Sequence, residues 1–162
     1  MRRLMGVFDK GDTKRFKERA YGISIEYPKG WKKKQGKQQV IALFMAPKSS
    51  NVGMFAPNVN ITVENLEERE MTLQEYVESS LQEESFTGYY QLISTESTTL
   101  SGLPALRIDF TGKEGLTSIR LLQVCVLQDH HVYAVTCAAE ASKFEEFEPL
   151  FQAMLDSYQL EG

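Results

Sequence analysis

The sequence predicts an α+β protein, a three-layer α/β/α sandwich in which two helices cover opposite sides of a mostly antiparallel sheet. Three observations support this class. Segments that alternate apolar and polar residues recur along the chain, and two longer stretches repeat apolar residues every three or four positions. The strand-like segments also follow one another through short turns. Such strands pair antiparallel, and amphipathic helices cover the resulting sheet.

The chain is expected to contain a single domain preceded by a basic arm. Residues 1–20 are polar and basic, and we expect a mobile arm with a helical turn near residues 14–20. The domain is expected over residues 21–162, a length that can bury a sizeable core without metals or disulfides.

Eight segments read as strands, four before the first helix and four after it. Their residue ranges are 21–27, 31–35, 38–47, 59–66, 89–100, 103–112, 116–128 and 131–140. The last two ranges are nearly continuous apolar runs, which is typical of central strands covered on both sides. Turns are expected at Ser101-Gly102 and at Asp129-His130.

Two helices complete the pattern. Thr72 and Glu75 form a capping box at the start of the first helix, because their spacing lets each side chain bond the other's backbone N–H. A second capping box is expected at Ser142 and Glu145, opening a helix that runs to residue 158. Pro149 lies inside this pattern and predicts a kink or a broken first turn.

Charge is unevenly distributed along the chain. Residues 1–37 contain twelve Lys/Arg and four Asp/Glu, whereas residues 38–162 contain six and eighteen, so a net charge of -4 combines +8 with -12. A basic segment could attract an acidic partner or an anionic membrane surface, or it could simply be solvated. The acidic remainder argues against general nucleic-acid binding.

The cysteine and histidine residues do not form a recognisable reactive site. With a turn at Asp129-His130, Cys125 lies opposite Ala134 and Cys137 points to the other side of the sheet, so we expect two buried thiols and no disulfide. His130 and His131, the only histidines, are expected at a polar hairpin tip. No metal ligand set is predicted.

No catalytic residues are predicted, and neither is a cofactor. The sequence contains no phosphate-binding glycine loop and no G-x-S-x-G motif. Its carboxylate pairs, such as Glu67-Glu68, are expected to be solvated. An enzyme is therefore not expected. No apolar run is long enough for a transmembrane helix.

Four stretches taken together resemble the PsbP/DcrB-like superfamily, whose fold is shared by the Ran-binding Mog-type proteins. They are "YGISIEYPKGW", "FAPNVNITVENL", "TTLSGLPALRIDFT" and "VYAVTCAAEASKFEEFEPLFQAMLDSYQL". The likeness spans about residues 20–160, with Ser157-Tyr158 where Ser-Phe is usual. It implies an α/β/α sandwich and a function by binding. Members include extrinsic photosystem II subunits, bacterial lipoproteins and chaperones of secreted effectors, but this chain matches none of the photosynthetic metal ligands and has no lipobox cysteine.

These observations lead to a non-catalytic binding, adaptor or accessory-subunit protein, present as a monomer or homodimer, whose protein partner the sequence does not name. The alternatives are a chaperone for secreted or membrane-bound clients, and an extrinsic or small-molecule- or metal-binding accessory protein. The N-terminus has no apolar signal segment, so the chain as written is expected to be cytoplasmic, or exported or lumenal if a leader has been removed.

The candidate binding residues lie around the only tryptophan and in a loop rich in Gly and Pro. Trp31 follows a tight turn and precedes three lysines, and Met54 and Phe55 are apolar residues in the loop over 47–58. One interpretation is that the tryptophan packs on the core while the lysines are solvated. The functional hypothesis is that these residues form one docking edge. Its residues are Trp31, Lys32, Lys33, Lys34, Met54 and Phe55.

Overall fold

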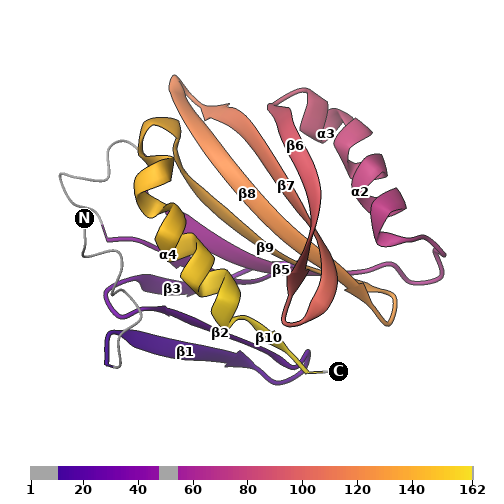
Figure 1. Ribbon diagram of the computed structural model, residues 1–162, viewed down its shortest axis with the longest axis horizontal. Coiled ribbons are helices and arrows are strands. Elements are labelled where there is room, and N and C mark those ends of the chain that lie inside the picture. Colours follow the sequence, from indigo (N-terminus) through magenta and orange to yellow (C-terminus); the bar gives the residue numbers. More distant parts are fainter. Residues whose placement is uncertain (1–10, 48–54, 162) are drawn as a thin grey trace.

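The computed structural model describes residues 11–47 and 55–161. Within these residues a seven-stranded sheet forms the centre of the fold (Figure 1). Its strand order is β3-β4-β5-β9-β8-β7-β6, and every neighbouring pair is antiparallel. The strands are β3 Lys32–Gln35, β4 Val40–Met45, β5 Asn58–Asn65, β6 Tyr90–Leu100, β7 Leu103–Glu114, β8 Thr117–Gln128 and β9 His131–Glu140. The two strands with continuous apolar runs, β8 and β9, lie in its interior as expected.

A second, three-stranded sheet contains a strand that the sequence assigned to the arm. Strands β1 (Thr13–Glu18), β2 (Ile23–Pro28) and β10 (Gln159–Leu160) pair in the order β1-β2-β10. The helical turn expected near residues 14–20 is therefore wrong, and residues 13–18 of the expected mobile arm belong to a sheet. The cause is pairing with β2, which supplies backbone partners that no local signal in this basic segment reveals.

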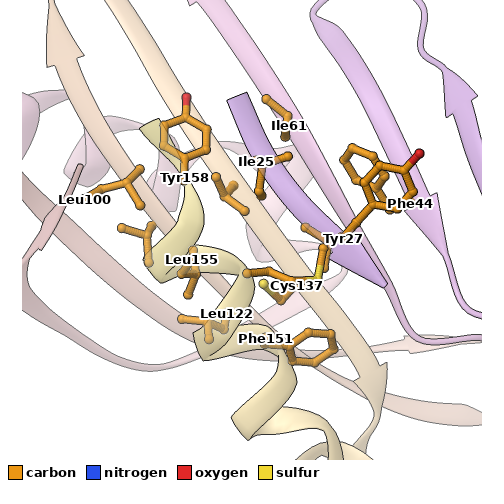
Figure 2. Packing of buried hydrophobic residues seen from close by; sticks show 14 of the residues in the cluster. Ile25, Tyr27, Phe44, Ile61, Leu100, Leu122, Cys137, Phe151, Leu155 and Tyr158 are labelled. Atoms are coloured by element: carbon orange, nitrogen blue, oxygen red, sulfur yellow. The ribbon is translucent and has the colours of Figure 1, made fainter. Parts of the chain in front are cut away.

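Helix α4 (Phe144–Ser157) and the small sheet cover one side of the seven-stranded sheet. Figure 2 shows Phe151 and Leu155 of α4 pointing at Leu122 and Cys137 of the sheet, with Ile25 and Tyr27 of β2 beside them. We call this core cluster 1. Ser157 ties the end of α4 to β2, because its hydroxyl accepts a 2.9 Å hydrogen bond from the Glu26 N–H.

Helices α2 (Leu73–Gln82) and α3 (Glu84–Thr87) cover the other side. Their apolar residues pack on a second core, cluster 2, which includes Leu66, Val77, Ile108, Phe110, Leu121 and Cys125. Successive strand residues alternate between the two clusters, as in Leu121 and Leu122. The predicted α+β sandwich with helices on both sides of an antiparallel sheet is thus confirmed.

The two predicted capping boxes have different outcomes. At α2 the Thr72 hydroxyl accepts from the Glu75 N–H at 3.0 Å, and the Glu75 carboxylate accepts from the Thr72 N–H at 2.9 Å, as predicted. The box at Ser142 is wrong. Residues Ala141–Lys143 form a 3-10 turn that contacts β8, and α4 begins at Phe144, whose buried ring anchors the start in cluster 1. Pro149 lies inside α4.

Both predicted hairpin turns are present. Asp129 and His130 have φ of 53° and 65°, and Ser101 and Gly102 have φ of 54° and 77°. Positive φ at both central residues matches the right-handed twist of the flanking strands in a two-residue hairpin. The β8–β9 register that follows pairs Gln128 with His131, as expected from the sequence.

Candidate functional site

The side of the large sheet that carries α2 is covered unevenly. On this side α2 contacts β7 and α3 contacts β6, and cluster 2 contains no described residue of β3 or β4. We call the part formed by β3, β4 and the start of β5 the open face. Its side chains are those of Lys32, Lys34, Leu43, Met45 and Asn58.

The open face combines positive charge with apolar side chains. Lys32 lies opposite Met45 and Lys34 opposite Leu43 in the β3–β4 register. Both lysines are exposed, whereas Leu43 and Met45 are half-buried. Apolar side chains bordered by charged ones are the arrangement that protein interfaces commonly show.

Trp31 and Lys33 lie on the opposite side of the sheet. Trp31 is half-buried and packs against cluster 1. The Lys33 ammonium nitrogen lies 5.3 Å from the centroid of the Phe16 ring, and Phe16 itself packs on cluster 1. The aliphatic part of the Lys33 side chain thus lies along apolar surface, while its ammonium group stays solvated and faces an aromatic ring.

The described candidate residue of the loop, Phe55, also lies on the side of the sheet opposite Trp31. Phe55 is half-buried and packs against cluster 2, on the side of the open face. Met54 lies outside the described residues. The structure therefore brings Lys32, Lys34 and Phe55 to one side of the sheet and Trp31 to the other, and the binding role of all six candidates remains a prediction.

A cavity of about 460 Å³ lies between the sheet and the α2–α3 layer. Three rings line it: Phe86 of α3, Tyr90 of β6 and Phe110 of β7, with pairwise centroid distances between 5.4 and 5.6 Å. Tyr76 and Ser80 of α2 contribute to its roof. The cavity is a concave, mostly apolar space of the size that small ligands occupy.

The sheet side of this cavity contains three polar side chains in one row. Asn60 of β5 lies opposite Thr136 of β9, and Thr136 lies opposite Gln123 of β8. The Gln123 side-chain amide donates to the Thr136 hydroxyl at 2.9 Å. Within residues 11–47 and 55–161, neither the Asn60 side chain nor the Gln123 side-chain oxygen has a hydrogen-bond partner. Sequence reasoning missed this row, although each residue is a lone polar position between apolar neighbours.

A hydrogen bond between Tyr76 and Glu64 fixes α2 above β5. The Tyr76 hydroxyl donates to the Glu64 carboxylate, and burial together with this bond raises the pKa of Tyr76 well above its ordinary value. Tyr76 is protonated at neutral pH, as tyrosines ordinarily are, and its hydrogen bond links the helix to the sheet.

A partly buried ionic network joins the other side of the sheet to α4. Asp109, whose side chain is 6% exposed, bonds Arg107 at 2.8 and 3.2 Å and Arg120 at 3.4 Å. Arg107 also reaches Glu148 of α4 at 3.4 Å. Hydrogen bonding to Asp109 is the main reason that the pKa of Arg107 is raised. Because two positive and two negative groups are paired here, the network is a structural connection and not a charged binding site.

Cys125 and Cys137 are free, buried and on opposite sides of β8 and β9, as predicted. The register places Cys125 opposite Ala134 and Cys137 opposite Leu122. Burial raises the pKa of the Cys125 thiol to about 12 and raises that of Cys137 further. Thiols in this state are poor nucleophiles.

The histidines lie at the exposed end of the β8–β9 hairpin, where the His131 Nδ1 is 2.9 Å from the Asp129 carbonyl oxygen. The part of the chain that the structure describes contains no group of three His, Cys, Asp or Glu side chains able to hold a metal ion. None of the helices in the described ranges is long and apolar enough to cross a membrane.

Comparisons with known proteins relate the chain to one sequence family and to several solved structures. The family model of PsbP-like proteins matches residues 8–160. No curated protein sequence matches the chain. The solution structure of cyanobacterial PsbP (CyanoP) from Synechocystis superposes with a TM-score of 0.71 at 13% identity, covering 95% of both chains.

Two further similar structures come from distant organisms. LpqN, involved in cell envelope biogenesis of Mycobacterium tuberculosis, gives a TM-score of 0.66 at 8% identity over 95% of this chain and 88% of its own. The Saccharomyces cerevisiae Ran-binding protein Mog1p gives 0.61 at 9% identity over 91% and 95%. At such identities the likeness concerns the fold. The family match over nearly the whole chain, together with this shared fold, shows that the chain belongs to the PsbP-like family.

Proposed function

We propose that this chain is a non-catalytic protein-binding domain that docks a partner on the open face. The observation that supports the proposal most directly is that β3 and β4 present Lys32 and Lys34 beside Leu43 and Met45, on sheet surface that no described helix covers. A structural neighbour described as a Ran-binding protein shows that this fold can serve protein recognition, although fold alone does not fix function.

The chemistry of the open face indicates an acidic partner. Two exposed ammonium groups attract carboxylates and speed association, and the half-buried Leu43 and Met45 can accept an apolar side chain at the centre of the contact. Phe55, packed on the same side of the sheet, extends the apolar part. Trp31 is then a core residue that holds β3 in place, in agreement with the structural interpretation of the sequence.

Site-specific photo-crosslinking in the source organism tests this proposal. A benzophenone amino acid at Leu43 should give a discrete crosslinked protein that is lost when Lys32→Glu and Lys34→Glu are added. The same probe at Leu116, which is 98% exposed in the β7–β8 turn, is the matched position control. Lys113→Glu, a charge reversal on exposed β7, should leave the crosslink intact. Identical products from Leu43 and Leu116 would contradict the proposal.

One observation favours a chaperone as a second candidate function. Strand β6 is the other edge of the sheet, is exposed over most of its length, and presents Leu92 and Ile93 at 47% and 49% exposure. An exposed strand edge with a single charged residue, Glu96, can pair with an extended client segment. A chaperone acting here should suppress aggregation of reduced insulin, and Ile93→Lys should abolish that effect while the double variant of Lys32 and Lys34 retains it. If the unaltered protein fails to suppress aggregation, the chaperone candidate is ruled out.

A further inference from the structure

The cavity under α2 and α3 has features that protein docking on the open face does not explain. A core between a helix layer and a sheet is normally filled by apolar side chains at high density. Here about 460 Å³ stays open, and its sheet side contains polar groups whose hydrogen-bonding capacity the described residues leave partly unused. Asn60 and Gln123 are half-buried, so their free polar groups remain accessible and can bond a molecule that enters the cavity.

The polar groups are arranged to meet a single small head group. Asn60, Thr136 and Gln123 occupy one register row on three adjacent strands, so their side chains converge on one region of the cavity. The Gln123 amide nitrogen is already engaged with Thr136, which leaves its oxygen as an acceptor. The Asn60 amide offers both a donor and an acceptor. The row can therefore bind a head group such as an amide or a hydroxyl.

The remaining walls suit an apolar body. Phe86, Tyr90 and Phe110 form a triangle of rings at the β6–β7 end, and Ile108 and Leu121 line the sheet beside them. Aromatic walls favour flat or branched apolar groups through dispersion and offset ring contacts.

The charge of the lining excludes an anionic ligand. Among the described residues around the cavity, the only charged one is Glu83, an exposed carboxylate at the connection between α2 and α3. Tyr76 is neutral near pH 7, as tyrosines ordinarily are, and therefore adds no charge to the lining. A carboxylate or phosphate would meet no positive partner in this space.

We propose that this cavity binds a small neutral molecule with an apolar ring or alkyl body and one amide- or hydroxyl-type head group. The head group bonds Asn60 and the Gln123 oxygen, and the body lies against the aromatic triangle. The polar row borders the open face, because Asn60 lies opposite Leu43, but the two proposals use different ligands and different binding side chains, so either can fail without the other.

N-phenylnaphthylamine is a suitable probe, because it is neutral and apolar, has a single N–H donor and fluoresces strongly only when desolvated. The unaltered protein should bind it saturably at one site, with intermolecular NOEs to the methyl groups of Ile108, Leu121 and Val77. Gln123→Leu keeps the side-chain volume but removes the acceptor, and should weaken binding by about tenfold. Lys32→Glu with Lys34→Glu should leave it unchanged.

A cavity-filling variant and a surface control complete the experiment. Ser80→Phe should abolish saturable binding, whereas Leu116→Phe, at a fully exposed position, should not. The NOE measurement on the unaltered protein needs no variant to fold. If binding is not saturable, the cavity holds water only and the proposal is overturned. NOEs confined to the exposed Leu92 and Ile93 would overturn it too.

Discussion

Removing the Asp109 carboxylate should destabilise the protein strongly, because it leaves two guanidinium groups without their shared partner. The Asp109 side chain is 6% exposed, whereas those of Arg107 and Arg120 are 21% and 33% exposed. Arg120 also stacks 4.8 Å from the Phe144 ring centroid, and its buried Nε has no hydrogen-bond partner among the described residues. The Asp109→Ala variant therefore tests how far this network holds α4 to the sheet.

Breaking a buried ion pair from one side costs about 3–5 kcal/mol. We expect the lower end, about 3 kcal/mol, because both arginines can turn partly to water. For a domain of this length that free energy corresponds to a fall in Tm of about 6–12 °C. Glu148→Ala is the matched control. Its carboxylate is 41% exposed and 3.4 Å from Arg107, so its loss should cost at most about 1 kcal/mol.

Urea unfolding followed by circular dichroism measures both values. A further variant, Arg107→Leu with Asp109→Leu, replaces the closest ion pair by apolar groups and should be more stable than Asp109→Ala. The reasoning would be refuted if Asp109→Ala cost less than about 1 kcal/mol, or if Glu148→Ala cost as much as Asp109→Ala.

Three further predictions concern Tyr158, Gly112 and the two cysteines. The Tyr158 hydroxyl is buried without a hydrogen-bond partner in the described part of the chain, so Tyr158→Phe should be neutral or stabilising by up to about 1 kcal/mol in urea unfolding, and a loss above that would show that the hydroxyl is bonded. A Cβ at Gly112 would lie 2.5 Å from the Tyr90 Cδ1, so Gly112→Ala should displace that ring, cost about 1–3 kcal/mol and weaken N-phenylnaphthylamine binding, whereas unchanged binding and stability would contradict the geometry. Cys125 and Cys137 should react with Ellman's reagent only on unfolding, and rapid reaction of the native protein would disprove that expectation. Burial raises the pKa of Cys125 in the folded state to about 12. The contribution of the protonated thiol to stability is therefore fully present below the ordinary thiol pKa and is lost as pH rises towards 12.

Local pattern predicted most of the strands and one helix start. The alternation in residues 21–27 and 59–66 gave strands with the expected apolar side inward, seen in β2 and β5. The Asp129-His130 turn fixed the β8–β9 register and so placed Cys125 and Cys137 on opposite sides. The capping box at Thr72 needed only neighbouring residues, and it is present as predicted.

The misses have a common physical cause, which is that the decisive partner lies far away in the sequence. Strand β1 is basic and has no fully buried residue, so only its pairing with β2 distinguishes it from a solvated arm. The capping box predicted at Ser142 does not form, because Phe144 is buried against distant strands and the helix begins there. The hypothesis of one docking edge grouped Trp31 with Phe55, whereas the other interpretation packed Trp31 on the core; in the structure Trp31 packs on cluster 1 and Phe55 on cluster 2.

The candidate sites depended even more on tertiary structure. Lys32 and Lys34 were visible as exposed lysines, but their apolar neighbours Leu43 and Met45 became apparent only from the β3–β4 register. The polar row joins residues that lie far apart in the sequence, namely Asn60, Gln123 and Thr136. They meet because β9 lies between β5 and β8 in the sheet.

The sequence by itself determined eight of the strands, the two longer helices and the positions of the tight turns, because these follow from side-chain periodicity and backbone preferences over a few neighbouring residues. Only the tertiary structure decided which strands are neighbours, which face lacks a helix and where a cavity remains. Those features depend on contacts between residues far apart in the chain, and the pattern of a short segment does not reveal which distant residues it will contact.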